Sequence, residues 1–592
     1  MYDPKILTVA LVIPGMIFLL YKEIIKPVLV FVLAIIILLA SGVISTQEAL
    51  SGFSNEQIAV IFLLLLVSDL IKRSGALDMY VFRLFRSNLG YRHFLLRMGT
   101  VVSGVSAFVN NTPLVALMMP YAYDWARRKR ISASKVLMPL SMSAIIGGTL
   151  TLIGTSTNLV VSGLAVSSGY EPLGMFAFTP IALPIVILVI LYMVIFSNKL
   201  LPKRKDALTE FKEHTREYVI ETKVPEGSIY AGKTLDDNKL RQLRGLYVVE
   251  LIRGDRRIAP VSPRDVIQAG DILIFAGETD TVIDLMNNRR DLVPADFADY
   301  PTTGRSDVVE AIVAPTSSLQ NKPVNTTNFR QNFDAAIVAV NRDGEKISGK
   351  VGDIELRNGD LLLLLAGKEF YRRAEKSRDL FVVSKRRQIN HADRSLVKWI
   401  LLGLAAALAL EAFDVISLLL SLMILTASVA LAGFVSVEDV KKSLDLELMV
   451  MLGLSIGIGK SISNSGLDEL FAHHVIEITG PLHPTIGVII GLYLVANILT
   501  MFVTNAAAAA ITFPIAVATA QQMGVSDLTP YFLTIAFAAS ADFLTPFGYQ
   551  TNLMVYGPGG YRFQDYIRYG LLPTIICMTL VIAGIAYWYN LV

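Results

Sequence analysis

Two pairs of asparagines lie in apolar stretches of the chain, and both pairs have the same spacing. Asn111 follows Phe-Val-Asn, and Asn505 follows Phe-Val-Thr 394 positions later; Asn158 and Asn552 are also 394 positions apart. Amide oxygens and unpaired backbone carbonyls coordinate sodium where a helix is broken inside a membrane, and the N-termini of half-helices attract an anion. The asparagines therefore predict ion-binding sites.

The neighbours of these asparagines are residue types that interrupt helices. Asn111 and Asn505 lie between apolar stretches too short to cross a bilayer separately, which predicts re-entrant hairpins with polar tips. Asn158 and Asn552 interrupt the next segments beside Gly and Thr, which predicts unwound helices. Because non-helical backbone at membrane depth is tolerated only where it is buried in protein or lines a cavity, these breaks indicate an internal site.

The alternative role for these asparagines is structural. One interhelical hydrogen bond in a membrane contributes about 0.6 kcal/mol, and for a single isolated asparagine that role is the usual one. Four asparagines at paired positions beside Gly, Thr or Pro favour the binding site instead.

The composition requires part of the chain to lie in lipid. Of 592 residues, 53% are hydrophobic and only 17% are charged, whereas soluble domains carry roughly 25% charged residues. The net charge of +3 is too small to predict a nucleic-acid partner. We find no Ser/His/Asp or Cys/His arrangement that suggests catalysis, so an enzyme is not expected.

Apolar segments form two blocks, residues 1–200 and 395–592, on either side of a charged stretch in which no segment could span a membrane. Landmarks recur in both blocks, as at Gly42 and Gly433 or Gly154 and Gly548. Duplicated membrane halves are typical of secondary transporters. Whether the copies are inverted depends on the number of crossings per half, which hydropathy does not decide. The expected fold is a membrane all-α protein of two inverted repeats with re-entrant hairpins.

The charged stretch contains a repeat of its own. A Gly-Asp turn at 270–271 recurs at 359–360, each time beside short apolar strands. This pattern predicts an α+β insert of two small tandem domains, residues 212–290 and 304–385. Basic clusters flank the insert, so the positive-inside rule predicts that residues of about 200–395 are cytoplasmic, in a multi-pass protein of the cell (plasma) membrane.

Three ionisable residues lie in apolar segments. Asp69 and Lys460 occupy paired positions, 391 residues apart, and either could gate or bind an ion, or lie near a helix end and reach the membrane surface. Asp542 lies beside the second broken segment, where a carboxylate would suit a hard cation such as sodium.

At these residues the chain resembles the divalent anion/sodium symporters (solute carrier family 13), within the wider ion-transporter superfamily. Members carry Ser-Asn-Thr at each hairpin tip, where this chain has Asn110-Asn111-Thr112 and Thr504-Asn505-Ala506. The resemblance implies a homodimer with an elevator-type mechanism, which moves a small anion through the lipid bilayer with co-transported sodium. The implied sodium ligands are Asn110, Asn111, Gly154 and Asn158 in the first half, and Thr504, Asn505, Gly548 and Asn552 in the second. The implied substrate ligands are Asn111, Thr112, Thr157, Asn505 and Thr551.

The departures from the family pattern bear on the substrate. Asn110 replaces Ser, and Ala506 removes a hydroxyl, which weakens the case for two carboxylates and favours a smaller divalent anion such as sulfate. The insert resembles tandem C-terminal domains of TrkA-type regulators (RCK_C), as in the sulfate-type branch, which implies regulation and a cyclic nucleotide as a possible ligand. The alternatives are a sodium-coupled dicarboxylate or tricarboxylate carrier, an ion channel, a sodium/proton exchanger, or a membrane sensor.

Overall fold

The structure is a computed structural model. It describes residues 4–22, 25, 27–73, 89–204, 219–238, 240, 246–254, 256–258, 261–262, 264–277, 292–294, 307–314, 317–342, 345–347, 351–367, 369–377, 379–383, 394–413, 415–432, 446–479 and 484–591.

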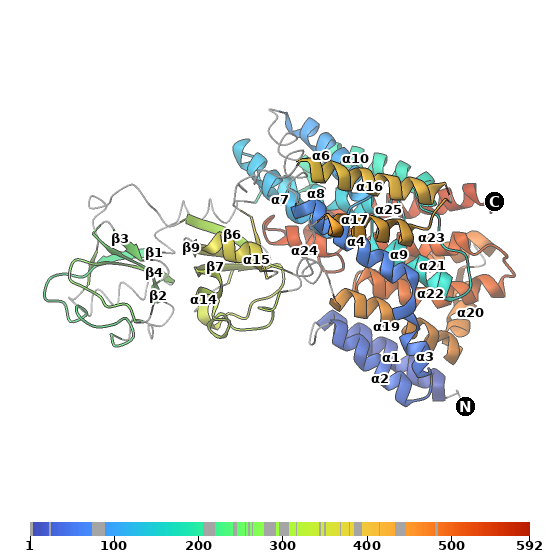
Figure 1. The fold of residues 1–592 in the computed structure, drawn as a ribbon, viewed down its shortest axis with the longest axis horizontal. Helices are drawn as coiled ribbons and strands as arrows, with labels where there is room; N and C mark the ends of the chain where they lie inside the picture. The colour runs from blue at the N-terminus through green and yellow to red at the C-terminus, as the bar shows by residue number, and fades with distance from the viewer. Residues whose placement is uncertain are drawn as a thin grey trace.

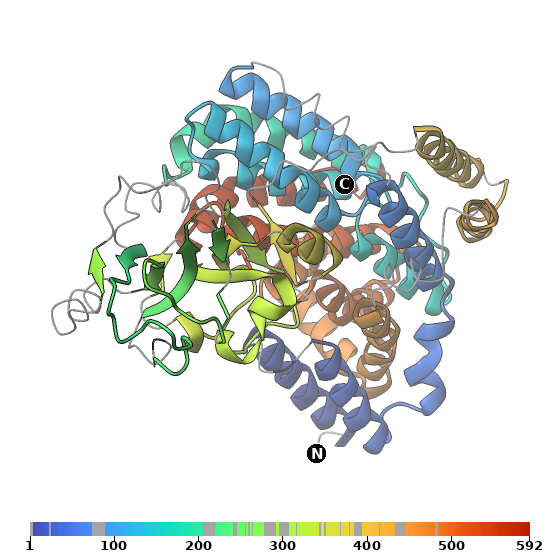
Figure 2. The same ribbon diagram turned by 60° about the vertical axis from the view of Figure 1, so that its left-hand side comes forward.

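Helices make up both apolar blocks (Figure 1). In the first block they are α1 (Pro4–Lys22), α2 (Pro27–Ala40), α3 (Thr46–Leu50), α4 (Glu56–Arg73), α6 (Tyr91–Ser106), α7 (Asn111–Arg128), α8 (Leu137–Gly148), α9 (Ser156–Ser167) and α10 (Thr179–Leu200). In the second they are α16 (Arg394–Ala412), α17 (Leu418–Leu431), α19 (Leu446–Ser465), α20 (Leu467–Thr479), α21 (Pro484–Thr500), α22 (Asn505–Gln522), α23 (Thr529–Ser540), α24 (Gln550–Tyr556) and α25 (Phe563–Trp588). Figure 2 shows α16 and α17 at the edge of the helical body, where α17 packs against α4.

Helix length separates spanning helices from broken ones. Within the described residues, α10 and α25 are long and apolar enough to cross a membrane, and α7 with the segment Ala133–Gly148 would make a third span if this pair, bent by 118°, were one crossing. Six further apolar helices in the described part of the chain have 10–17 residues. The prediction that several segments enter the bilayer and turn back stays a prediction.

The helices around the paired asparagines follow one pattern in both blocks. In the first, α6 is separated from α7 by residues 107–110, and α8 from α9 by residues 149–155; in the second, residues 501–504 and 541–549 make the equivalent breaks. The short helix after each second break packs on the other block: α9 contacts α22 and α23, and α24 contacts α7 and α8. The two halves are therefore interlocked at their broken segments.

The charged stretch forms two antiparallel sheet units of the same topology. The first has the order β3-β2-β4-β1-β5, and the second, read as β8-β7-β9-β6-β10, has the same order. Their strands are β1 (Val219–Lys223), β2 (Leu246–Arg253), β3 (Arg256–Ile258), β4 (Ile272–Gly277), β5 (Val293–Pro294), β6 (Asp307–Val313), β7 (Ala335–Arg342), β8 (Glu345–Lys346), β9 (Leu361–Ala366) and β10 (Leu380–Val382). The second unit also has α14 (Phe329–Phe333) and α15 (Phe370–Lys376).

One ion pair repeats in both units. Arg253 binds Asp271 with Nε–Oδ1 and Nη2–Oδ2 distances of 2.8 and 2.7 Å, and Arg342 binds Asp360 at 2.7 and 2.7 Å. Each aspartate belongs to the Gly-Asp turn found in the sequence, and each pair ties the end of one strand to the start of its neighbour. Each unit has a hydrophobic core of its own, and the second unit lies between the first and the helical body (Figure 1).

Candidate functional site

The first tip is the turn between α6 and α7. Asn111 begins α7, and its side chain is buried. The Ser106 hydroxyl, at the end of α6, lies 2.5 Å from Asn111 Oδ1 and 2.8 Å from the Ala144 carbonyl oxygen. Asn111 Nδ2 donates to the Tyr549 hydroxyl at 2.5 Å. The first tip is therefore tied directly to the broken segment of the other half.

The second tip repeats the first in its own half. Thr500 is the last residue of α21, and its hydroxyl lies 2.9 Å from Asn505 Oδ1 and 2.7 Å from the Ala539 carbonyl oxygen. Thr504 caps α22, because its hydroxyl accepts from the Ala507 amide at 3.3 Å. In both halves a hydroxyl from the preceding helix fixes the tip asparagine, and the two N-termini carry unpaired amides and partial positive charge.

Asn158 and Asn552 lie just beyond the breaks rather than inside them. Each is the third residue of its short helix, α9 or α24. Asn158 Nδ2 donates to the Thr151 carbonyl at 2.9 Å, and Asn552 Nδ2 donates to the Thr545 carbonyl at 3.1 Å. The non-helical stretch predicted beside these asparagines lies directly before them, and their amides pair with carbonyls of that Gly- and Thr-rich stretch.

Gly154 and Gly548 lie where oxygen atoms converge. A Cβ at Gly154 would lie 2.5, 2.9 and 3.0 Å from the carbonyl oxygens of Gly148, Ser106 and Ala107. A Cβ at Gly548 would collide with the Thr500 carbonyl oxygen and with Asp542 Oδ2. Oxygen donors suit a hard cation such as sodium. No group of three His, Cys, Asp or Glu that could hold a metal is found in the described part of the chain.

Two buried side-chain oxygens at the site have no hydrogen-bond partner in the described part of the chain. They are Asn158 Oδ1 and Thr551 Oγ1, and both residues are fully buried. Asn552 Oδ1, by contrast, accepts from the Ser141 hydroxyl at 2.7 Å. Since nearly all buried polar atoms in proteins are paired, these two oxygens are available to a ligand.

The remaining predicted ligands of the first half are Thr112 and Thr157 for the substrate and Asn110 for sodium. Thr112 Oγ1 donates to Gln550 Oε1 at 3.1 Å, which is a second bond between the halves. Thr157 is buried in α9. Asn110 caps α7 without a side-chain hydrogen bond to the helix. The first tip is thus joined to the second half by two hydrogen bonds, Asn111 to Tyr549 and Thr112 to Gln550.

Sequence reasoning missed three residues of this site. Tyr549 joins the halves, and its hydroxyl also lies 3.3 Å from Thr155 Oγ1, the residue at its own repeat position. Ser106 and Thr500 were missed as well. Matched hydroxyl residues five positions before each tip asparagine are a signal that could have found them.

Lys460 is half-buried in α19. Hydrogen bonds from the Ser45 backbone, the Asn464 side chain and the Ser45 side chain lower the pKa of Glu48, and the positive charge of Lys460 makes a smaller contribution in the same direction. The Asp69 side chain lies outside the described residues, so its role in gating or ion binding stays a prediction. Asp542 is at the second break and is fully buried.

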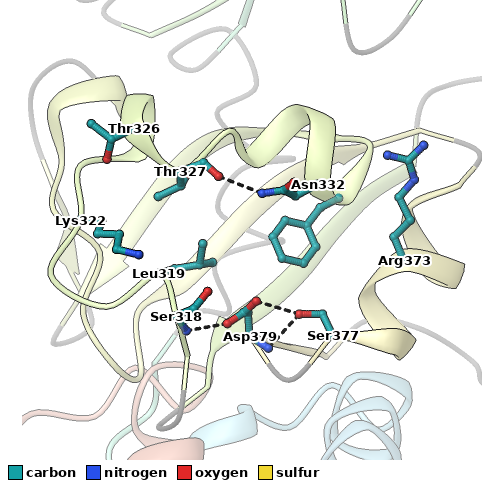
Figure 3. A pocket seen from close by; sticks show the side chains of 10 residues that line it. Ser318, Leu319, Lys322, Thr326, Thr327, Asn332, Arg373, Ser377 and Asp379 are labelled. Atoms are coloured by element: carbon teal, nitrogen blue, oxygen red, sulfur yellow. Dashed lines mark hydrogen bonds between the residues drawn. The ribbon is translucent and has the colours of Figure 1, made fainter. Parts of the chain in front are cut away.

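A separate polar pocket of about 310 Å³ lies in the second sheet unit. Figure 3 shows Lys322 and Arg373 on opposite sides of it, and Asp379 held by the Ser318 amide and the Ser377 hydroxyl. The cyclic nucleotide expected on the insert stays a prediction.

Paired tips and interlocked breaks in an apolar helical body define a membrane transporter. The chain belongs to the citrate transporter family, whose model it matches over residues 16–534. It is 33% identical to the "Putative sulfur deprivation response regulator" of Chlamydomonas reinhardtii, over 90% of this chain and 93% of that one. It is 30% identical to an uncharacterised transporter of Synechocystis, over 92% and 91% of the two chains. It is also 29% identical to sodium/sulfate cotransporter 2 of Chlamydomonas reinhardtii, over 54% of this chain and 38% of that protein.

Proposed function

We propose that the protein is a sodium-coupled symporter of a small divalent anion, sulfate in the first instance. The observation that carries the proposal is the hydrogen bond from Asn111 to Tyr549, which joins the first tip to the broken segment of the second half. The anion lies between the N-termini of α7 and α22, where unpaired amides and helix dipoles face it. Its side-chain ligands are Asn111, Thr112, Thr157, Asn505 and Thr551.

Sodium is carried with the anion. One ion lies beside Gly154 among the carbonyl oxygens of Ser106, Ala107 and Gly148, with Asn158 Oδ1 within the same buried region. The other lies beside Gly548, near Asn505 and Asn552. The halves work as inverted repeats in a homodimer of the plasma membrane, and an elevator-type motion carries the tips across it. Residues of about 200–395 lie in the cytoplasm, in two domains of the TrkA C-terminal type.

Sulfate is favoured by the second tip and by the relatives. Ala506 offers no hydroxyl where Thr112 offers one in the first tip, so the site has fewer donors for a second carboxylate. Relatives that match over about half of this chain are sodium/sulfate cotransporters. The family model is named for citrate, and that name favours a dicarboxylate or tricarboxylate carrier as the second candidate.

Uptake of radiolabelled sulfate into proteoliposomes tests the proposal. We expect saturable uptake under an inward sodium gradient, little uptake when choline replaces sodium, and no inhibition by excess succinate or citrate. Inhibition by either acid would establish the second candidate. Sulfate flux that does not saturate would indicate a channel, and sodium flux driven by a proton gradient without any anion would indicate an exchanger.

The insert is proposed to regulate transport by holding the helices of the site. The helix that starts at the first tip and the helix that follows the second break both reach the second sheet unit. Tyr123 of α7 donates to Glu310 Oε1 at 3.3 Å, and Glu310 is fully buried. At the end of α24, a Cβ at Gly557 would collide with the Gly359 carbonyl oxygen. A carrier must visit at least two conformations, so a contact that holds one of them slows turnover.

The change Tyr123→Phe is expected to raise the maximal rate of sulfate uptake about threefold or more with little change in KM, because a lost hydrogen bond to a buried carboxylate weakens docking by about 1–3 kcal/mol. Initial rates in proteoliposomes measure this effect. Glu310→Gln should act in the same direction, whereas Tyr587→Phe, on the exposed end of α25, should leave the rate unchanged. An unchanged or reduced rate in Tyr123→Phe would show that the contact does not restrain transport.

A further inference from the structure

The oxygens nearest the two glycines differ in charge, and we infer that this difference sets the order of binding: the Gly548 site takes a sodium ion without the anion, and the Gly154 site takes one only together with the anion. The inference rests on the proposed function and assigns a role to Asp542. The two glycines occupy matched positions, 394 residues apart, so their surroundings can be compared atom by atom.

One carbonyl oxygen is matched at the two glycines. The Ser106 carbonyl oxygen faces Gly154, and the Thr500 carbonyl oxygen, at the matched position, faces Gly548. The next oxygen at Gly154 is the Gly148 carbonyl, whereas at Gly548 it is Asp542 Oδ2. A carboxylate oxygen therefore takes the place of a neutral carbonyl oxygen, and only the Gly548 site gains a negative charge.

Asp542 is held in place without a positive partner. It is fully buried, and the Thr545 hydroxyl lies 3.2 and 3.0 Å from its two carboxylate oxygens, while the Thr545 amide donates to Oδ1 at 3.3 Å. No Lys, Arg or His of the described chain makes an ion pair with it. A buried carboxylate is costly unless a positive charge compensates it, so this site favours a cation even when it is otherwise empty.

The first half has no room for an equivalent carboxylate. Gly148 stands at the matched position, 394 residues before Asp542. A Cβ at Gly148 would lie 2.6 Å from Asn111 Oδ1. The tip asparagine thus occupies the space that a side chain would need, and the asymmetry is a consequence of packing.

The charges at the two sites determine whether each sodium ion needs the anion in order to bind. A sodium ion surrounded only by neutral oxygens in a buried site has lost its hydration without gaining a counter-charge, and a dianion bound nearby supplies that charge strongly because the surroundings have a low dielectric constant. Sodium binding at the Gly154 site therefore requires the bound anion, and binding of the anion requires that sodium ion. Asp542 supplies the counter-charge at the Gly548 site. Binding of the sodium ion at this site therefore does not depend on the anion.

Asp542 also stabilises the local turn, and this second role must be separated from the charge. Asn at position 542 has the same shape, and its amide oxygen can still accept from the Thr545 amide and hydroxyl. Asp542→Asn therefore keeps the turn and removes the charge. Asp527→Asn is the matched control, because it removes an exposed carboxylate that accepts from the Thr529 amide at 2.9 Å.

The inference is tested by measuring the binding of radioactive sodium to the purified full chain by scintillation proximity. Binding is measured once with gluconate and once with sulfate as the anion of the medium. Wild type and Asp527→Asn should bind one sodium ion per chain in gluconate and two in sulfate. Asp542→Asn should bind sodium in gluconate at least about tenfold more weakly. Unchanged sodium binding by Asp542→Asn would overturn the inference. A wild-type stoichiometry of zero or two sodium ions in gluconate would also overturn it, and that measurement does not depend on the folding of a variant.

A failure of the proposed function gives a different result. If wild type binds no sodium in either medium, sodium coupling itself is wrong, and the inference falls with it. If sodium binds in sulfate alone, coupling stands and the assigned role of Asp542 is wrong.

Discussion

Replacing Asn111 by alanine is expected to abolish sodium-driven sulfate uptake and to leave the protein folded. The Asn111 amide bonds both its own half and the other, through Ser106 and Tyr549. Its removal leaves buried hydroxyls without this partner, at about 1–3 kcal/mol each, and deletes a ligand of the anion. Two such losses lower initial uptake about 100-fold or more.

The control for this variant is an asparagine with a similar number of bonds in another apolar helix. Asn464, in α19, donates to the Val43 carbonyl at 3.1 Å and to Glu48 Oε1 at 3.0 Å. Asn464→Ala should retain most of the uptake, and both variants should elute from size exclusion as wild type does. Wild-type uptake by Asn111→Ala, or an equal loss in Asn464→Ala, would contradict the role of the tip.

Adding a single methyl group at Gly154 is expected to abolish coupled uptake as well. The new carbon would lie 2.5 Å from the Gly148 carbonyl oxygen, inside the group of oxygens that we assign to sodium. Either the oxygens move apart or the methyl group fills the site, and both weaken sodium binding. We expect uptake to fall about 100-fold, and the sodium concentration for half-maximal uptake to rise about tenfold or more, a loss of at least about 1.4 kcal/mol.

The matched control is Gly104→Ala. Gly104 lies in α6, two residues before Ser106, and a Cβ there meets nothing within 4 Å. Alanine favours helix over glycine by about 1 kcal/mol, so this variant should be at least as stable as wild type and fully active. If Gly154→Ala kept wild-type sodium dependence, the oxygens around Gly154 would not form a sodium site.

The parts of the site that could be predicted from sequence are those that the duplication records. Asn111 and Asn505 break apolar stretches at matched positions, and the structure has a helix starting at each of them. The repeat in the insert was visible in the same way, because the turn at Asp271 and Asp360 needs glycine in the left-handed region before it, at Gly270 and Gly359.

The parts that could not be predicted depend on contacts between distant segments. Nothing in the sequence shows that α9 packs on the second half and α24 on the first, so Tyr549 could not be assigned to the Asn111 tip. The exact end of each break could not be predicted either, because the polarity of an amide does not reveal whether it lies in the unwound stretch or supports that stretch from the next helical turn.

Equilibrium binding of radiolabelled sulfate to the purified protein tests most directly whether the two tips form one site. We predict one saturable site per chain in sodium chloride, loss of that site when choline replaces sodium, and loss of binding in both Asn111→Ala and Asn505→Ala. Wild-type affinity in either variant would contradict a site shared by the two tips.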